Sequence, residues 1–215
     1  MNSPFADISM VQRNKIFNLL RVHFYKFKKN QEILATIQDE NIVAIILTGH
    51  AQILTTDYNG NEILLEDLKE ESIFGTNITL MHHENCEIYA KEDTEVVVMH
   101  YNSLFNNELL KYSYFTIFLK NLFEIINAKY KETNERVRIL EQKTIRDKLL
   151  EYFEVEYKKT YQRTFTLPFN LKNLSDYLAV NRSAMFRELK NLKEEKFIST
   201  KGNKITLLYK KNSII

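Results

Sequence analysis

The sequence predicts an α+β fold in which a β-rich N-terminal part is followed by a long helix and then by a helix-turn-helix with an adjoining hairpin. Three observations support this prediction. Short β-like runs separated by glycine fill residues 20–100, and a helical repeat without Gly or Pro covers residues 104–140. Two short amphipathic helices, joined by three residues, lie within residues 171–192.

The runs in residues 20–100 are typical of the strands of an all-β sandwich or a small barrel. Asn59-Gly60-Asn61 separates two of them, and Asn-Gly is the strongest short hairpin signal. Gly49 and Gly75 mark further turns, because a positive φ is inexpensive only for glycine. The expected strands are Phe24–Phe27, Glu32–Thr36, Ile42–Leu47, Ala51–Thr55, Glu62–Leu65, Cys86–Ala90 and Thr94–Met99.

Residues 104–140 are expected to form one uninterrupted helix. Residues spaced alternately by four and three lie along one stripe of this helix. The stripe is either a face that packs into the core or a seam between two helices. We favour a dimer seam, because the helix links two domains and becomes polar in its second half. The expected seam residues are Phe115, Leu119, Leu122, Ile126, Lys129 and Thr133, and the repeat continues to Arg136 and Leu140.

The C-terminal part continues with a helix from Ile145 to about Lys159 and a short strand at Thr164–Leu167. Two short helices follow, Leu171–Leu178 and Arg182–Leu192, and then a hairpin over Phe197–Leu208 that turns at Lys201-Gly202-Asn203. The apolar faces of the two short helices consist of Leu171, Leu174 and Leu178 on the first and Met185, Leu189 and Leu192 on the second.

Only Ala179-Val180-Asn181 separates these two helices, which is the spacing of a helix-turn-helix. The small side chains of Ser175 and Ala179 lie where the helices must approach closely, and Asn170 and Asn181 are well placed as N-caps. Together with the hairpin at Gly202, the unit is predicted to be a winged helix-turn-helix.

The net charge of +2 conceals an asymmetry along the chain. Residues 1–140 contain 14 lysines and arginines against 19 acidic residues, whereas residues 141–215 contain 16 against 9. A basic C-terminal third attached to an acidic remainder favours contact between that third and a polyanion. A solvated lysine-rich surface is the alternative explanation.

The second short helix directs a basic face away from its apolar side. A major groove accepts such a helix, and the planar fork of arginine pairs with guanine or with phosphate. Phe186 is suited to contact a thymine methyl group. A helix pair that merely packs is the alternative, but the short turn, the caps, the charge and the wing together favour DNA binding. The expected DNA-binding residues are Arg182, Ser183, Phe186, Arg187, Lys190, Asn181, Lys172 and Lys201.

Three segments of the sequence resemble the CRP/FNR family of bacterial transcription regulators. LSDYLAVNRSAMFRELKNLKEEKFI is similar to the family's helix-turn-helix, and VAIILTGHAQILTTDYNGNEILL with SIFGTN is similar to its effector-binding β-roll. The resemblance covers almost the whole chain. It implies a double-stranded β-helix (β-roll, cyclic-nucleotide-binding-like) sensor domain over residues 1–103, a dimerisation helix over 104–140 and a winged helix-turn-helix over 141–215.

The resemblance further implies a homodimer that binds a pseudo-palindromic promoter site on double-stranded DNA. A small-molecule effector is expected to control this binding, and RNA polymerase is a possible further partner. Arg182 and Arg187 fall on the family's DNA-contacting arginines. Ser183 departs from the glutamate that many members carry there, so the half-site sequence is not expected to be that of its relatives.

The effector is not cAMP on this prediction. Members that bind cyclic nucleotides carry a glutamate one residue after the Phe-Gly turn and an Arg-Ser/Thr-Ala run further on. Here Thr76 follows Gly75, and Glu84-Asn85-Cys86 stands at the position of the basic run. A carboxylate where a phosphate needs a cation is repulsive. The expected pocket contains Phe74, Gly75, Thr76, Asn77, Glu84, Asn85 and Cys86, and neither the effector nor any cofactor is identified from the sequence.

Two alternatives remain. His82, His83 and Cys86 are the one cluster with ligand chemistry, so the chain is alternatively a haem- or metal-dependent sensor, although we favour a polar surface loop and expect no metal. The second alternative is a ligand-binding module without DNA binding. The single cysteine excludes an internal disulfide and a four-thiolate iron–sulfur or zinc site within one chain.

No enzymatic activity is expected. The sequence has no phosphate-cradling glycine loop, metalloprotease helix motif or nucleophile elbow, and Glu84, Glu87, Asp93 and the scattered histidines form no acid–base pair. The longest apolar runs, such as 42–47, are too short to cross a bilayer, and residues 1–10 lack the pattern of a signal peptide. We therefore expect a cytoplasmic protein without a membrane partner.

Overall fold

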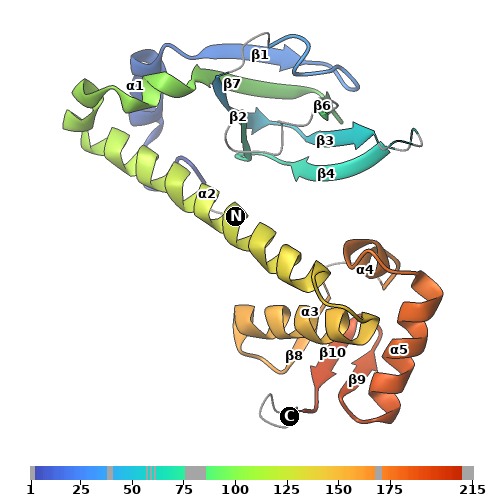
Figure 1. The fold of residues 1–215 in the computed structure, drawn as a ribbon. Coiled ribbons are helices and arrows are strands. Elements are labelled where there is room, and N and C mark those ends of the chain that lie inside the picture. The colour runs from blue at the N-terminus through green and yellow to red at the C-terminus, as the bar shows by residue number, and fades with distance from the viewer. Residues whose placement is uncertain are drawn as a thin grey trace. The chain divides into compact units, whose positions relative to one another are not determined.

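The computed structural model describes residues 3–37, 41–56, 58, 60, 62–75, 86–167 and 171–209. The chain divides into two compact units, Met1–Ala128 and Lys129–Ile215, and the division falls within helix α2 (Ser113–Leu140). The predicted α+β class is confirmed, with a β-roll in the first unit, the long helix α2 and a winged helix-turn-helix in the second (Figure 1). The predicted division at residues 103 and 140 stays a prediction.

The first unit contains two antiparallel sheets, with strand orders β1-β7-β2-β5 and β4-β3-β6. A hydrophobic core of isoleucine, valine, alanine and phenylalanine side chains from both sheets fills the interior of the roll. The strands are β1 (His23–Phe27), β2 (Ile42–Thr48), β3 (Ala51–Thr56), β4 (Glu62–Leu68), β5 (Ile73–Gly75), β6 (Cys86–Ala90) and β7 (Thr94–His100).

Strand β2 lies in the middle of the four-stranded sheet and is buried on both faces. Ala44 and Ile46 belong to the core inside the roll, whereas Val43 and Ile45 belong to a second core on the outer face of the sheet. Because both faces are buried, the strand is a continuous apolar run without polar alternation. Gly75 pairs with Val43, and a Cβ atom at Gly75 would lie 2.1 Å from the Ile42 carbonyl oxygen, so this register requires glycine.

Helix α1 (Met10–Leu20) packs on that outer face, together with the 3-10 helices η1 (Tyr101–Phe105) and η2 (Asn107–Lys111) and the first half of α2. Helix α1 was not predicted, although the sequence holds a signal for it. The Ser9 hydroxyl accepts a hydrogen bond from the Gln12 amide at 3.3 Å, and the Gln12 side chain accepts one from the Ser9 amide at 2.9 Å. This is a capping box, which typically opens a helix.

The predicted strand Glu32–Thr36 is wrong. Glu32 forms only an isolated bridge to Tyr89, and the amides of Thr36 and Ile37 both donate to the Ile33 carbonyl. The segment is a turn whose buried side chains, Ile33 and Ile37, are four residues apart. That spacing suits a helical turn, whereas a strand with one buried face would bury every second residue.

The prediction of one helix over residues 104–140 is also wrong at its beginning. The backbone is extended at Asn106 and again at Tyr112, and these two residues separate η1, η2 and α2. The Asn106 side chain accepts a hydrogen bond from the Glu108 amide at 3.0 Å and so caps η2. An asparagine side chain that bonds to a nearby backbone amide can interrupt a helix even where no glycine or proline is present.

The second unit contains a three-stranded sheet of order β8-β10-β9 and a core formed by its helices and strands. The predicted hairpin turn at Lys201-Gly202-Asn203 is confirmed, with Gly202 at a φ of 60°. Pro168 and the predicted N-cap Asn170 lie outside the described residues. The elements are α3 (Ile145–Thr160), β8 (Thr164–Thr166), α4 (Leu171–Tyr177), α5 (Arg182–Glu194), β9 (Ile198–Lys201) and β10 (Lys204–Leu207).

Within the part of the chain that the structure describes, none of the helices combines the length and the hydrophobicity needed to cross a bilayer.

Candidate nucleic-acid interface

The turn between α4 and α5 is short and closed by backbone hydrogen bonds. Ala179 has a φ of 50°, and the amide of Val180 donates to the Ser175 carbonyl at 3.1 Å. Ser175 is buried, as expected for a small residue where two helices meet. The predicted apolar faces are confirmed by the burial of Leu174, Leu178, Met185, Leu189 and Leu192, which all belong to the core of this unit.

Asn181 caps the N-terminus of α5. Its side-chain oxygen accepts a hydrogen bond from the Ala184 amide at 3.1 Å, which confirms the predicted N-cap. The predicted contact of Asn181 with DNA stays a prediction. The cap determines where α5 begins and therefore which side chains stand on the first turn of this helix.

Two cationic side chains of α3, Arg146 and Lys148, contact the buried side of the α4–α5 pair. The Arg146 guanidinium donates to Glu188 at 3.3 Å and to Glu195 at 2.9 Å, and it lies 4.9 Å from the ring centre of Phe197. The Lys148 ammonium donates to the Leu178 carbonyl at 3.2 Å, just beyond the end of α4. Cations at a helix C-terminus stabilise it, because the last carbonyls lack helical partners.

The hydrogen bonds between Arg146 and Glu195 raise the pKa of the guanidinium and lower the pKa of the carboxyl. Both groups therefore remain charged near neutral pH, and Arg146 compensates acidic side chains of α5 and its C-cap. No sequence signal marks Arg146, because its partners Glu188 and Glu195 lie more than forty residues further along the chain.

The opposite face of α5 is exposed and basic. The side chains that the helical spacing directs outward are all exposed: Arg182, Ser183, Phe186, Arg187 and Lys190. The Arg182 guanidinium lies 5.6 Å from the ring centre of Phe186, and Lys190 forms an exposed pair with Glu194 at 3.7 Å. Arg187 forms no ion pair or hydrogen bond with any residue that the structure describes. The face therefore presents two arginines that acidic side chains do not neutralise.

The wing adds a second basic element. Lys201 and Lys204 lie directly opposite each other across the β9–β10 hairpin, and both are exposed. Like charges in this position repel each other, and a bound anion would relieve the repulsion. Lys204 was not among the predicted residues; the signal for it is its position opposite Lys201. The side chain of the predicted Lys172 lies outside the described residues.

The predicted seam of α2 is partly wrong. Phe115 and Leu122 are buried in the core of the first unit, together with Phe118 and Ile125, so they are not available to a second chain. Leu119, Ile126 and Lys129 are half-buried and Thr133 is exposed.

A different set of α2 residues exposes large hydrophobic side chains. Phe123, Tyr130 and Val137 are 64%, 66% and 46% exposed and are spaced by seven residues. With Leu119, Ile126 and Thr133 they form a heptad repeat, which we call the α2 seam. The predicted stripe shares Leu119, Ile126 and Thr133 with the α2 seam, but its other positions precede those of the seam by one residue. The error arose because the core face and the exposed apolar face of α2 are adjacent.

Most of the predicted effector and metal residues are not tested. Thr76, Asn77, His82, His83, Glu84 and Asn85 lie outside the described residues. Phe74 is buried in the core of the roll, Gly75 ends β5, and Cys86 is half-buried at the start of β6. Among described residues, no group of three or more His, Cys, Asp or Glu side chains is arranged to hold a metal ion.

The chain thus joins a β-roll and a winged helix-turn-helix. The sequence profile of the cyclic nucleotide-binding domain family matches residues 25–107, which lie in the first unit. A comparison with curated protein sequences gives no match.

Solved structures with the same fold cover nearly the whole chain. CprK in complex with OCPA is 19% identical to this chain, with 91% of each chain covered and a TM-score of 0.58. A point variant of CprK with OCPA is 17% identical and has a TM-score of 0.59; the match covers 90% of this chain and 89% of that chain. A CooA mutant from Carboxydothermus hydrogenoformans is 18% identical, covers 91% and 90% and has a TM-score of 0.55. These proteins are CRP/FNR-family regulators, and the chain has their fold.

Proposed function

We propose that the chain is a CRP/FNR-type transcription regulator that binds a promoter site on double-stranded DNA as a homodimer, with α5 as its recognition helix. The observation that carries this proposal is the exposed basic face of α5, held on a compact helix-turn-helix. A helix with such a face fits the major groove, where its first turns contact base edges.

The residues of this face have distinct roles in the proposal. Arg187 stands on the second turn of α5, and its planar fork is suited to guanine O6 and N7. The Phe186 ring next to Arg182 offers an apolar surface to a thymine methyl group. Lys201 and Lys204 on the wing supply cations for backbone phosphates. Base contacts thus come from α5 and positioning contacts from the wing.

The α2 seam supports the dimer. Exposed aromatic side chains at heptad spacing are costly in water and are stabilised by burial against a second helix. Two copies joined along α2 present two recognition helices related by a two-fold axis, and such a dimer reads a site with the same symmetry. We further propose that an effector bound in the β-roll modulates DNA binding, and that it is not cAMP, because Glu84 stands near the position of the basic run.

Binding to a random-sequence duplex tests the electrostatic part of the proposal without knowledge of the operator. We expect the logarithm of the binding constant, measured by fluorescence anisotropy, to fall linearly with the logarithm of the KCl concentration, because bound cations release counterions from DNA. Replacing Lys201 and Lys204 by glutamine should reduce the slope by about 1 for each phosphate that no longer has a lysine beside it.

The matched control replaces two exposed lysines of the first unit, Lys15 and Lys29, by glutamine. The slope of this control should equal that of the wild type. A binding constant independent of salt, or an equally reduced slope in both double variants, would contradict the proposal.

A further inference from the structure

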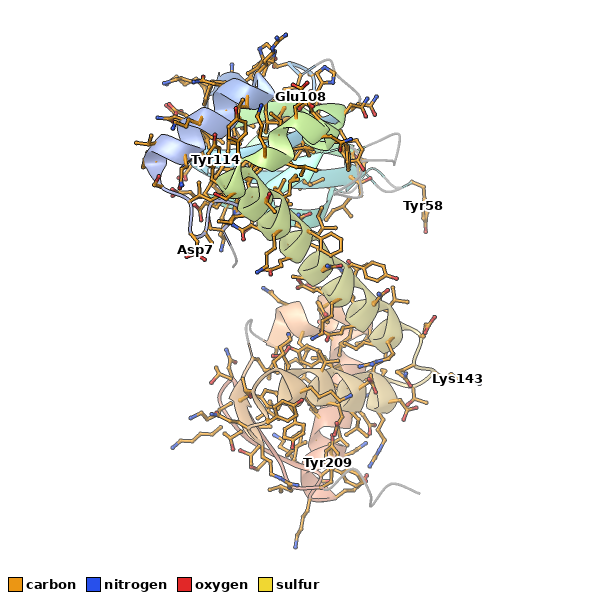
Figure 2. All side chains as sticks on the ribbon, turned by 90° about the vertical axis from the view of Figure 1, so that its left-hand side faces the viewer. Asp7, Tyr58, Glu108, Tyr114, Lys143 and Tyr209 are labelled. Carbon is orange, nitrogen blue, oxygen red and sulfur yellow. The ribbon has the colours of Figure 1, made fainter. Side chains whose placement is uncertain are left out.

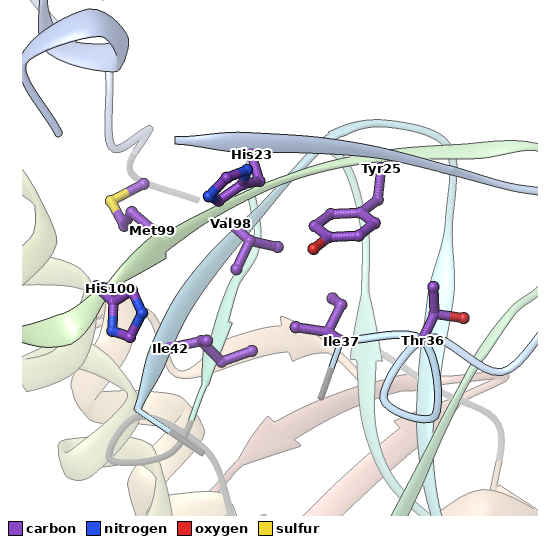
Figure 3. A pocket seen from close by; sticks show the side chains of 8 residues that line it. All are labelled: His23, Tyr25, Thr36, Ile37, Ile42, Val98, Met99 and His100. Carbon is purple, nitrogen blue, oxygen red and sulfur yellow. The ribbon is translucent and has the colours of Figure 1, made fainter. Parts of the chain in front are cut away.

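The first unit contains a pocket of about 370 Å3 at one end of the roll. Side chains from β1, β2, β7 and the turn before residue 38 line it, and none of the residues of the predicted effector pocket does so in the part of the chain that the structure describes. The lining residues are His23, Tyr25, Thr36, Ile37, Ile42, Val98, Met99 and His100 (Figure 3).

The strand register explains why these side chains converge. His23 of β1 pairs with Val98 of β7, and Ile42 of β2 pairs with His100. Residues that pair directly, and residues two apart on one strand, point to the same face of a sheet. The two imidazoles therefore lie on the same face as Val98 and Ile42, although His23 and His100 are far apart in the sequence.

The pocket has an apolar floor and a polar rim. Ile37, Ile42 and Val98 are buried and form the floor, and Figure 3 shows the Tyr25 hydroxyl directed toward these side chains. His23 and His100 lie toward the other end of the same pocket. Neither the His23 imidazole nor the Tyr25 hydroxyl forms a hydrogen bond or ion pair with a residue that the structure describes, so both remain available to a ligand.

This chemistry selects a class of ligand. Pockets for small molecules are commonly apolar with a few converging polar groups, and their volumes range from about 300 to 1,000 Å3, so this pocket takes a small molecule such as a single ring or a short chain. Imidazole and phenol groups donate hydrogen bonds, and no described lining residue is acidic. An anionic group on the ligand would bind most tightly here, because hydrogen bonds to a charged acceptor are stronger than those to a neutral one.

We propose that this pocket binds a small monocarboxylate with a compact apolar body. The carboxylate accepts hydrogen bonds from the Tyr25 hydroxyl and the His23 imidazole, and the apolar body lies on Ile37, Ile42 and Val98. The proposal does not rest on DNA binding. Val98, Met99 and His100 are the last residues of β7, directly before η1.

Calorimetric titration of the full-length chain tests the proposal with two matched pairs of probes, benzoate with benzamide and hexanoate with hexanamide. At least one carboxylate should bind, and its amide should bind at least about 10-fold more weakly. Tyr25→Phe and His23→Ala should each weaken carboxylate binding by about 10-fold. Tyr58→Phe is the control, because Tyr58 is fully exposed and projects away from its unit (Figure 2).

Proton NMR of the wild type provides a second measurement that needs no stable variant. The carboxylate should shift the ring signals of His23 and His100 and leave that of His50, which contacts Asp67, unchanged. The proposal is overturned if neither carboxylate binds at about 10 mM, where a Kd of 1 mM would give near saturation. Equal binding of acid and amide, or a shift at His50 alone, overturns it as well.

Discussion

A variant with glutamate at both Phe123 and Tyr130 is expected to be monomeric. These are the most exposed aromatic residues of α2, and their spacing of seven places them on one side of the helix. Burying two carboxylates from each chain in a helix–helix seam is strongly unfavourable without paired cations. Both side chains are exposed within the chain itself, so the fold should remain intact.

Light scattering coupled to size exclusion should give half the wild-type mass for this variant. Its affinity for an operator should fall by about 100-fold or more, because two linked recognition helices bind with an avidity that one lacks. The control is Lys131→Glu, an exposed position of α2 outside the heptad repeat. If the double variant kept both the dimer and the affinity, the α2 seam would not be the dimer interface.

Arg187→Ala is expected to remove most specific DNA binding while leaving the fold unchanged. The side chain is exposed and has no partner among the described residues, so the free energy of unfolding should change by no more than about 0.5 kcal/mol. A good bidentate contact to a base is worth about 1–3 kcal/mol, and a symmetric dimer makes it twice. We therefore expect binding to the operator to weaken by roughly 2–6 kcal/mol.

Competition with random-sequence DNA separates this effect from a general loss of charge. Arg187→Ala should weaken binding to random DNA much less than binding to the operator. Lys193→Ala, which removes an exposed cation from the same helix, should affect both DNAs equally and slightly. A specificity ratio unchanged by Arg187→Ala would show that Arg187 does not contact bases.

Much of the fold was predictable from local signals. Glycine at turns and short apolar runs predicted β1, β2, β3, β6 and β7, and helical spacing with asparagine capping predicted α5. The errors arose where burial depended on distant partners. The apolar side chains of Ile33 and Ile37 are compatible with either a strand or a turn. Only a turn packs both of them into the core.

The exposed basic face of α5 was predictable because it depends on helical spacing alone, and its contact with DNA stays a prediction. Arg146 and the carboxylate pocket were not predictable. Arg146 contacts residues more than forty positions away, and His23 and His100 come together only through the pairing of β1 with β7. On α2, Leu119 and Ile126 border both apolar faces, so periodicity alone did not separate the core face from the α2 seam.

In vitro selection of duplex DNA by the purified full-length chain tests the central claim most directly. We expect the selected sequences to contain an inverted repeat whose half-sites are centred about 10–10.5 base pairs, or a multiple of this, apart. Such a motif follows from two copies of α5 related by two-fold symmetry. Selection that enriched no motif, or only a single asymmetric one, would contradict DNA recognition by a symmetric pair of α5 helices.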